Sequence, residues 1–476
     1  MPLKVFNTLG QRMEVFKPLR DNAVGMYVCG PTVYDHSHIG HARTYIAFDV
    51  IVGYLRYKGF EVKYVVNITN IDDRIINRAK ELGEDPMKLA DKFEEEFFDD
   101  VKALGIAKAD VYPKVTDHIP EIVKAIQTLV EKGFVYAANG DVYFDVRKVT
   151  DYGKLSRQSL EDVKAGARVD VSEKKRFPVD FALWKVSKLG EPGWDSPWGK
   201  GRPGWHIECS VMSAKYLGPQ FDIHGGAQDL IFPHHENEIL QSEAASGKKP
   251  FVKYWLHTGF LNVEGKKMSK SLGNIIPISE LLKKYSAEEF RLFVLSAHYR
   301  SPINFTYKSL NQARKNLEKL YNLIHNINAL IKEQKKEKMD REEKEFYEKL
   351  EDLKRKFLEA MDDDFNTPLA LKHLFTIERK TNAYVRSRVD VSKELLNRFL
   401  DLFSELGSIL GILKEVREVP EKLPEELARL IEEREEARKR EDWETADRIR
   451  LHIRELGIIL EDTPEGVKWR KKHRKN

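Results

Sequence analysis

The chain has 476 residues, of which 41% are hydrophobic and 33% are charged. This length predicts two to four domains, and the hydrophobic share is high enough for large buried cores. The 80 basic and 76 acidic side chains leave a net charge of only +4, which excludes a uniformly cationic coat for nucleic acid. Cys29 and Cys209 are the only cysteines, so a disulfide framework is excluded as well.

The sequence carries no sign of a membrane segment or a secretory leader. No apolar run approaches the ~18 residues of a membrane helix. The N-terminal sequence MPLKVFNTLG lacks the charged-then-apolar pattern of a signal peptide. Two thiols in a chain of this length fit a reducing compartment. We therefore expect a cytoplasmic protein with no membrane partner, and we expect it to be a monomer.

The first part of the chain predicts one half of a nucleotide-binding fold. Residues 24–29 form a short apolar run suited to a buried strand, residues 40–57 have helical spacing, and residues 62–68 predict a second strand. Strand, loop, helix and strand make half of a doubly wound sheet, in which ligands bind at the carboxyl ends of the strands. We assign residues 1–116 to this Rossmann-type catalytic domain.

A connective insertion is predicted over residues 117–204. A helix at 119–132 precedes a hairpin at 136–145, where Asn139 and Gly140 both accept the positive φ of a tight turn. Loops rich in glycine and proline follow. A second α/β half resumes at Trp205, so residues 205–305 are expected to complete the catalytic domain.

The rest of the chain is predicted to be largely helical. Apolar residues at three- and four-residue spacing predict a helical bundle over 306–418, from segments 309–336, 341–361, 368–388 and 391–414. Residues 419–476 predict two charged helices and a strand at 457–460. The expected fold class is α/β: a Rossmann-type doubly wound parallel sheet with an insertion, followed by an α-helical bundle and a small C-terminal α+β unit.

Basic residues crowd the C-terminus. They form either a local nucleic-acid surface or a solvated tail, and charge alone does not decide between the two. The residues are Lys468, Arg470, Lys471, Lys472, Arg474 and Lys475.

A histidine-rich loop at residues 31–41 lies between the first strand and the first helix. A helix start offers unpaired N–H groups and a partial positive charge, which suits phosphate, and Gly40 leaves room for a nucleotide to approach. His38 and His41 are three residues apart, so both rings can donate hydrogen bonds to a transferring phosphoryl group. A polar loop with incidental histidines is the alternative for this segment taken alone.

A basic, hydroxyl-rich stretch lies between glycines at residues 265–274. It has no apolar periodicity, which predicts a mobile surface loop. Lys267 and Lys270 could fold over a polyphosphate and neutralise the charge that develops on a leaving pyrophosphate. Taken alone, such a loop is more often simply solvated.

Four potential metal ligands converge on one end of the predicted sheet. Cys29 ends the first strand, Cys209 lies shortly after Trp205, and His234 and Glu238 are four residues apart on one helix face. Two thiolates, an imidazole and a carboxylate make a chemically reasonable zinc set. Each residue alone has a plainer explanation, as a buried thiol or a surface His–Glu pair.

The first two constellations resemble the HIGH and KMSKS motifs of class I aminoacyl-tRNA synthetases, and both occur without substitution and in the expected order. The third sharpens the resemblance to the cysteinyl-tRNA synthetases, whose zinc ligands map onto Cys29, Cys209, His234 and Glu238. This resemblance extends over essentially the whole chain.

The resemblance implies that the chain activates L-cysteine with ATP, as its Mg2+ complex, and loads it onto tRNA(Cys). One zinc ion (Zn2+) per chain would bind the substrate thiol and so distinguish cysteine from serine. Because four protein ligands normally close a zinc site, we expect a fifth ligand position or a loosely held Glu238. The expected catalytic residues are His38, His41, Lys267 and Lys270. The expected ATP contacts are Thr32, His38, Gly40, His41, Gly225, Gly226, Asp229 and Lys270, and the expected cysteine contacts are Cys29, Thr69 and Trp205.

Reading of the anticodon is assigned to the helical bundle and the C-terminal unit. Anticodon bases are unstacked, so aromatic stacking and arginine hydrogen bonds should recognise them. Ordinary surface or core positions are the alternative for each candidate. The candidates are Arg434, Arg438, Trp443, Arg448 and Trp469.

Two other functions share part of this pattern. A ligase that joins cysteine to an amino sugar would have the first two motifs and the zinc set, but it has no use for an anticodon module. A non-catalytic, zinc-stabilised RNA-binding paralogue would not need His38, His41, Lys267 and Lys270 intact.

Overall fold

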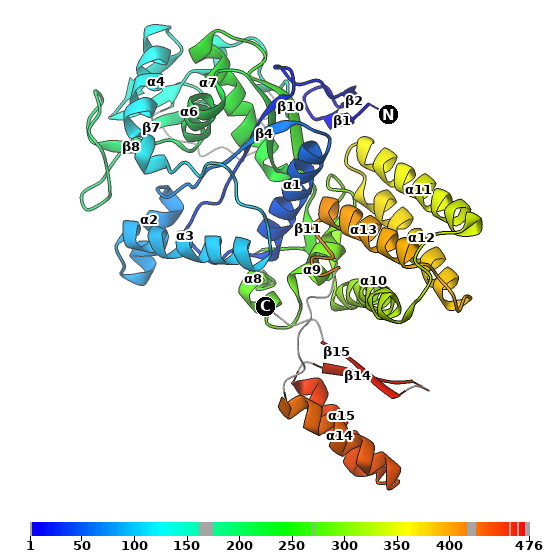
Figure 1. Ribbon diagram of the computed structural model, residues 1–476. Helices are drawn as coiled ribbons and strands as arrows, with labels where there is room; N and C mark the ends of the chain where they lie inside the picture. Colours follow the sequence, from blue (N-terminus) through cyan, green and yellow to red (C-terminus); the bar gives the residue numbers. More distant parts are fainter. Residues whose placement is uncertain are drawn as a thin grey trace. The chain divides into compact units, whose positions relative to one another are not determined.

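The computed structural model describes residues 2–160, 175–269, 272–416, 425–456, 458–463 and 466–471. Two compact units divide the chain between them. The first contains Met1–Ile278, Val294–Thr306 and Lys356–Leu371, and the second contains Ser279–Phe293, Tyr307–Arg355 and Lys372–Asn476. Figure 1 shows the elements of both units.

A four-stranded parallel sheet forms the centre of the first unit. Its strands are β3 (Ala23–Val28), β4 (Glu61–Val66), β9 (Phe221–Ala227) and β10 (Val252–Thr258), in the order β10-β9-β3-β4. The chain therefore runs outward from β3 in one direction and from β9 in the other. This order confirms the Rossmann-type prediction, and it places the switch point, where such folds bind ligands, between β3 and β9.

Helix α1 (Ile39–Tyr57) connects β3 to β4, close to the predicted bounds. Thirteen of its residues are buried, so it is apolar on nearly all sides rather than amphipathic. Helices α2 (Asp73–Leu82) and α3 (Pro86–Ala103) follow β4, each capped at its start by an aspartate, Asp72 or Asp85.

The insertion contains α4 (Ile119–Glu131) and a second, antiparallel sheet. Its strands β5 (Val135–Ala138), β6 (Asp141–Phe144), β7 (Phe181–Val186) and β8 (Gly201–Pro203) lie in chain order. Asn139 and Gly140 have φ of 51° and 84°, which confirms the predicted hairpin turn.

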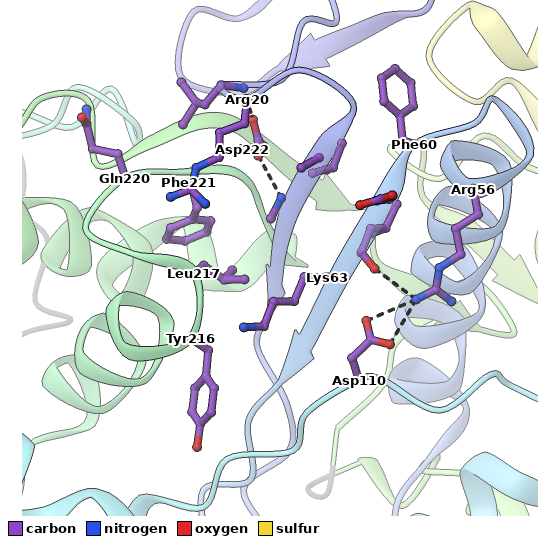
Figure 2. A pocket seen from close by; sticks show the side chains of 16 residues that line it. Arg20, Arg56, Phe60, Lys63, Asp110, Tyr216, Leu217, Gln220, Phe221 and Asp222 are labelled. Carbon is purple, nitrogen blue, oxygen red and sulfur yellow. Dashed lines mark hydrogen bonds and ion pairs between the residues drawn. The ribbon is translucent and has the colours of Figure 1, made fainter.

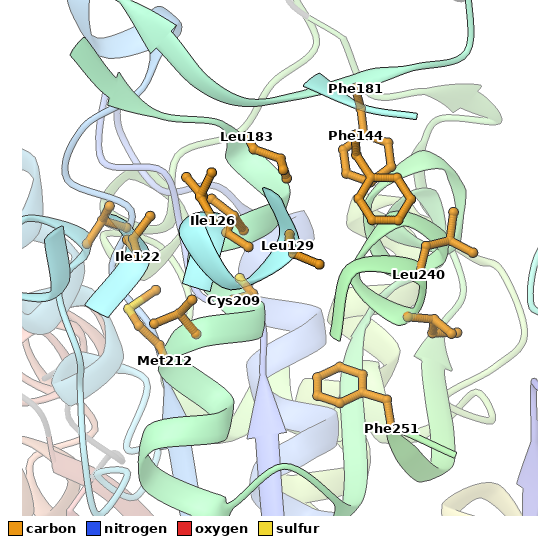
Figure 3. Close-up of a cluster of buried hydrophobic side chains, with 14 of the residues drawn as sticks. Ile122, Ile126, Leu129, Phe144, Phe181, Leu183, Cys209, Met212, Leu240 and Phe251 are labelled. Atoms are coloured by element: carbon orange, nitrogen blue, oxygen red, sulfur yellow. The ribbon is translucent and has the colours of Figure 1, made fainter. Parts of the chain in front are cut away.

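The insertion shares a hydrophobic core with the helices α6 (Trp205–Leu217) and α7 (Glu236–Ser246). Figure 3 shows Leu129 of α4 and Phe144 and Phe181 of the insertion sheet near Cys209 and Leu240 of those helices. Because α6 carries Cys209 and α7 carries Glu238, the insertion supports the elements that hold the predicted metal ligands.

The first unit also contains two small sheets. Strands β1 (Lys4–Asn7) and β2 (Arg12–Val15) form a hairpin, and β11 (Leu261–Val263) pairs with both β12 (Lys266–Lys267) and β13 (Ile303–Phe305).

A pocket of about 650 Å³ lies at the amino-terminal ends of β3, β4 and β9 (Figure 2). Three of the charged side chains in its wall form hydrogen bonds within the protein. Arg56 donates to both oxygens of Asp110, and Asp222 accepts the N–H groups of Leu19 and Gly25. This end of a parallel sheet is not where the fold binds its ligands.

The remaining elements are helical except for a terminal hairpin. Helices α8 (Ile278–Leu282) and α9 (Ala287–Leu295) precede α10 (Tyr307–Glu333), α11 (Arg341–Asp362), α12 (Thr367–Arg386) and α13 (Lys393–Leu410). The ring of Phe346 stacks on Tyr384 at 4.0 Å and meets the edge of Phe399 at 6.1 Å, which joins α11, α12 and α13 in the predicted bundle. None of the helices in the described ranges is long and apolar enough to cross a membrane.

The last part of the chain has one more strand than the sequence predicted. Helices α14 (Glu425–Lys439) and α15 (Trp443–Glu455) precede β14 (Ile458–Thr463) and β15 (Gly466–Lys471), which pair in antiparallel fashion. Three of the basic residues at the C-terminus therefore lie in β15, namely Lys468, Arg470 and Lys471. Lys472, Arg474 and Lys475 lie outside the described residues.

Asp364 ties the turn between α11 and α12 to the N-terminal hairpin of the first unit. Its carboxylate is 2% exposed, and it accepts hydrogen bonds from the N–H of Phe6 at 2.7 Å, Tyr299 Oη at 2.8 Å and Arg300 Nε at 2.5 Å.

We expect Asp364→Ala to lower the free energy of unfolding by about 3 kcal/mol, because buried donors lose their acceptor. Urea unfolding followed by circular dichroism measures the loss. The exposed neighbour Asp363 provides the control, since Asp363→Ala should change stability by less than about 0.5 kcal/mol. Equal losses in the two variants would contradict this role for Asp364.

Candidate active site

A cavity of about 710 Å³ opens at the carboxyl ends of β3, β4 and β9. Its wall combines parts of all three constellations that the sequence singled out. The predicted site residues in this wall are Cys29, Thr32, His38, Gly40, His41, Thr69, Trp205, Cys209, Asp229, His234 and Lys267.

Three other predicted site residues do not line the cavity, and a fourth, Lys270, lies outside the described residues. Glu238 is fully buried. Gly225 and Gly226 are buried in β9, where an added Cβ would lie 2.4 Å from the ring of Phe48 or 2.9 Å from that of His235. Close packing of the strand therefore explains both glycines.

The HIGH sequence forms the start of α1. His38 is the N-cap, and its Nδ1 accepts the N–H groups of Gly40 and His41, while His41 Nδ1 accepts the N–H of His38. The two rings stack with centroids 3.7 Å apart. The N–H of Ile39 donates to the carbonyl of Ile276. The expectation of unpaired amides here is therefore wrong for Ile39, Gly40 and His41, and the two imidazoles line the cavity instead.

The KMSKS sequence begins on β12 with Lys267, and its next residue, Met268, lies beside the HIGH sequence. Lys267 is exposed, with its Nζ 5.3 Å from the ring centroid of Phe260. Met268 lies against Gly40, where an added Cβ would be 2.8 Å from Met268 Cε. A glycine at position 40 thus lets the two motifs touch.

The four predicted metal ligands are brought together, three of them in the cavity wall. Donor atoms of Cys29, Cys209, His234 and Glu238 all lie within 4.8 Å of one another, and all four residues are buried. The two sulfur atoms are 4.0 Å apart, and His234 Nε2 is 3.0 Å from Glu238 Oε1. That oxygen has no partner with hydrogen-bond geometry among the described groups. An acceptor oriented in this way suits a cation.

A second possible ligand group, which the sequence did not reveal, overlaps the first. It consists of Cys29, His224, His235 and Glu238. His224 Nε2 lies 2.9 Å from Glu238 Oε2, and His235 Nε2 lies 3.2 Å from Cys29 Sγ. A histidine within the buried strand β9 was the available signal. The first group alone has three members in the cavity wall, so it is the better placed to meet a substrate.

The electrostatics of this cluster follow from burial and close pairing. Burial raises the pKa of Glu238, but His224 and His234 outweigh it and lower the pKa to about 2. Burial raises the pKa of Cys29 well above its usual value. Cys209 is buried as well, yet its bonds with Cys29 and His234 lower its pKa to about 6. The cluster thus already favours a carboxylate and one thiolate, the ionised forms that bind metals.

Aromatic and cationic side chains cover the cluster on the cavity side. The ring of Trp205 stacks on His234 at 4.3 Å. Arg74, which the sequence reading missed, lies 5.4 Å from the Trp205 ring and donates to Thr32 Oγ1 at 3.3 Å. Thr69 Oγ1 donates to the buried carboxyl of Glu208. These contacts hold Trp205 and Thr69 at the edge of the predicted cysteine pocket.

The predicted anticodon residues belong to the last four elements of the chain. Trp443 is 59% exposed, Arg448 is exposed and Arg438 is partly exposed, whereas Arg434 is 3% exposed and paired with Glu435. Trp469 lies on β15, and its side chain lies outside the described residues.

Comparisons with known proteins agree over the full length. Residues 15–315 match the family model for the class I (C) tRNA synthetase catalytic domain, residues 356–414 match the DALR domain, and residues 421–470 match the cysteinyl-tRNA ligase anticodon-binding domain. The cysteine–tRNA ligase of Thermococcus gammatolerans is 52% identical over 477 residues, covering 99% of both chains. That of Heliobacterium modesticaldum is also 52% identical, covering 99% of this chain and all of its own.

A solved structure with the same fold is Mycobacterium tuberculosis methionyl-tRNA synthetase in complex with methionyl-adenylate. Its TM-score is 0.62 over 82% of this chain and 89% of that one, at 16% identity. The parallel sheet, with HIGH at the start of α1 and KMSKS after β12, defines a class I aminoacyl-tRNA synthetase. Full-length identity of about half then fixes the family: the chain belongs to the cysteine–tRNA ligases. The match over residues 421–470 leaves neither alternative function favoured.

The environment of His41 sets its charge. Burial, with the nearby charges of His38 and Arg74, lowers the pKa of His41 to about 3. We expect its imidazole to remain neutral down to about pH 4, well below the ordinary titration range of histidine. It would then act at neutral pH as an N–H donor and not as a cation. NMR titration of the ring signals, assigned with a His41→Gln variant, measures this, and a midpoint near 6.5 would contradict it.

Proposed function

We propose that this chain activates L-cysteine with ATP and transfers the cysteinyl group to tRNA(Cys). The observation that carries the proposal is the position of the buried Cys29–Cys209–His234–Glu238 cluster. It lies in the floor of the cavity whose wall contains the HIGH sequence and Lys267. Membership of the cysteine–tRNA ligases supports the same reaction.

In the first step, the carboxylate of cysteine attacks the α-phosphate of ATP, and pyrophosphate leaves. His38 and His41 donate hydrogen bonds to the phosphoryl group as its charge grows. Lys267 and Lys270 hold the departing phosphates. These roles are electrostatic and positional, so they need fixed donors more than a proton transfer. In the second step, the terminal ribose of the tRNA attacks the carbonyl carbon of the adenylate, and AMP leaves.

The donor set suits zinc, because two thiolates, an imidazole and a carboxylate match its preference for soft and nitrogen ligands. When bound, zinc would take the substrate thiolate as a ligand, which the hydroxyl of serine replaces poorly. Cys29, Thr69 and Trp205 surround the space that this thiol would enter. Mg2+ enters the reaction with ATP and needs no site of its own in this proposal.

The adenosine of ATP is assigned to the side of the cavity formed by Thr32, Gly40 and Asp229. Gly225 and Gly226 lie behind this wall in β9, so they would shape the adenosine site without touching the nucleotide directly.

We assign the catalytic domain to residues 1–116 and 205–305, the insertion to 117–204, the tRNA-binding bundle to 306–418 and the anticodon unit to 419–476. Exposed Trp443 offers a ring for a base to stack on, and Arg438 and Arg448 offer donors on neighbouring helices. Arg434 is buried, so it would contribute by supporting α14. We expect the protein to act as a monomer in the cytoplasm.

Two histidine variants test which group binds the metal. His234→Ala should lower zinc affinity at least about tenfold, because it removes a ligand, whereas His235→Ala should keep one zinc per chain. Metal content after dialysis against a mild chelator measures both, and Cys209→Ser should lose zinc as well. The reverse order, with zinc lost only in His235→Ala, would assign the metal to the second group.

Exchange of labelled pyrophosphate into ATP tests the reaction itself. Cysteine should support exchange, and serine should be weaker by about 10⁴-fold, since a site built for one functional group rejects its analogue strongly. His41→Ala should lower the exchange rate about 100-fold with zinc content unchanged. Charging of tRNA(Cys) completes the assay. Cysteine transfer to an amino sugar but not to tRNA would contradict the proposal.

A further inference from the structure

Arg43 is a buried cation on α1 whose hydrogen-bond partners are backbone oxygens. It follows His41 by two residues, and it is 2% exposed. Its Nη1 donates to the carbonyl of Gly259, and its Nη2 donates to the carbonyl of Ser301 and, at 3.3 Å, to that of Tyr299. A guanidinium kept from water needs such partners, because a buried charge without hydrogen bonds is strongly unfavourable.

These carbonyls mark the places where the chain enters the small sheet of β11, β12 and β13. Gly259 links β10 to β11, and Tyr299 and Ser301 come shortly before β13. The two segments are also bonded to each other, since Gly259 N–H donates to the Tyr299 carbonyl at 2.8 Å. One residue further along α1, Thr44 Oγ1 lies 2.9 Å from Thr258 Oγ1. Helix α1 is therefore fastened to the base of the small sheet.

The small sheet in turn carries the KMSKS sequence. Strand β11 pairs with β12 through Asn262 with Lys267 and Val263 with Lys266. After the KMSKS sequence, the chain is again hydrogen-bonded to the start of α1 and the loop before it. The Ile276 carbonyl accepts the N–H of Ile39, and the Ser37 carbonyl accepts the N–H of Ile278, both at 3.0 Å. The chain is thus hydrogen-bonded to α1, or to the loop that precedes α1, both before and after the segment that carries Lys267.

We propose that Arg43 is a positioning residue that sets where Lys267 stands relative to His38 and His41. Arg43 does not itself line the cavity. It acts through the segment of Gly259, Phe260 and Leu261, which does. This inference rests on the proposed function, in which the lysines hold the leaving pyrophosphate. The space assigned to the cysteine thiol is lined by Cys29, Thr69 and Trp205, so we expect cysteine binding to be independent of Arg43.

The shape of the guanidinium explains why arginine is needed for this role. Its planar fork donates in two directions at once and so spans carbonyls from both segments. A lysine keeps the charge but offers one compact donor centre, so it can restrain fewer of the carbonyls. A methionine fills a similar volume and restrains none. Replacing Arg43 by lysine and by methionine therefore removes these hydrogen bonds stepwise, while the length of the side chain is kept.

Single-turnover measurements on the full-length protein separate the two half-reactions. R43M should slow cysteinyl-adenylate formation by about 10- to 100-fold, the size of effect that a misplacement of about 1 Å produces, and R43K should slow it less. The cysteine KM, the zinc content and the rate of transfer from preformed adenylate to tRNA should not change. The matched control is R56M, which removes another α1 arginine, one that pairs with Asp110 at the opposite end of the sheet.

A double-mutant cycle with Lys267→Ala shows whether Arg43 acts through the loop. If it does, R43M combined with K267A should be no slower than K267A alone. The proposal would be overturned if the losses of the two single variants multiplied in the double variant. It would also be overturned if R43M slowed both half-reactions equally or left the rate of adenylate formation unchanged. Should R43M fold poorly, R43K and its cycle with K267A decide by the same criteria. Absence of cysteine-dependent exchange in the unsubstituted protein would instead contradict the proposed function, and this inference with it.

Discussion

Four groups that readily carry charge are held within a few ångströms of one another in the dry floor of the cavity, and the surrounding structure is arranged to support them. Cys29, Cys209, His234 and Glu238 are all buried. Burial of ionised groups is unfavourable unless each has partners. Glu238 has His224 and His234 beside it, and His234 has Trp205 stacked on its ring. The first unit therefore has to bring β3, β9, α6 and α7 together at one point.

The position of this cluster explains how one fold can combine two chemical tasks. Residues for both tasks follow β3 closely. Cys29 comes directly after the strand, and the HIGH sequence begins nine residues later at His38. In the proposed function, the thiol is recognised at the buried cluster. Phosphate chemistry is assigned to the stacked imidazoles and Lys267, which line the same cavity. Distinct walls of one cavity allow each task to be tuned without disturbing the other.

The sequence predicted much of this architecture because its signals were local. The strand before Cys29, the hairpin at Asn139-Gly140 and the four bundle helices each follow from spacing and turn chemistry within a few residues. The four candidate metal ligands stood out in the sequence because two cysteines and a His–Glu pair are chemically unusual, and the structure brings the four together. Strand β15 was missed because its basic residues, Lys468, Arg470 and Lys471, read as a tail, whereas pairing with β14 decides the structure. The roles of Arg74 and Arg43 arise from tertiary contact and had no local signal, whereas His224 was marked only by its place in a buried strand.

The bond between Phe6 N–H and the Asp364 carboxylate joins residues 358 positions apart. A ribosome releases the chain from its N-terminus, so the hairpin of β1 and β2 is made long before Asp364. The insertion core likewise needs α7, which ends at Ser246. More than half of the chain must therefore be synthesised before that core can close, and more than three-quarters before the N-terminal hairpin gains its last bond. During synthesis, this protein presents unfinished apolar surface for a long interval, the interval in which chaperones act on nascent chains.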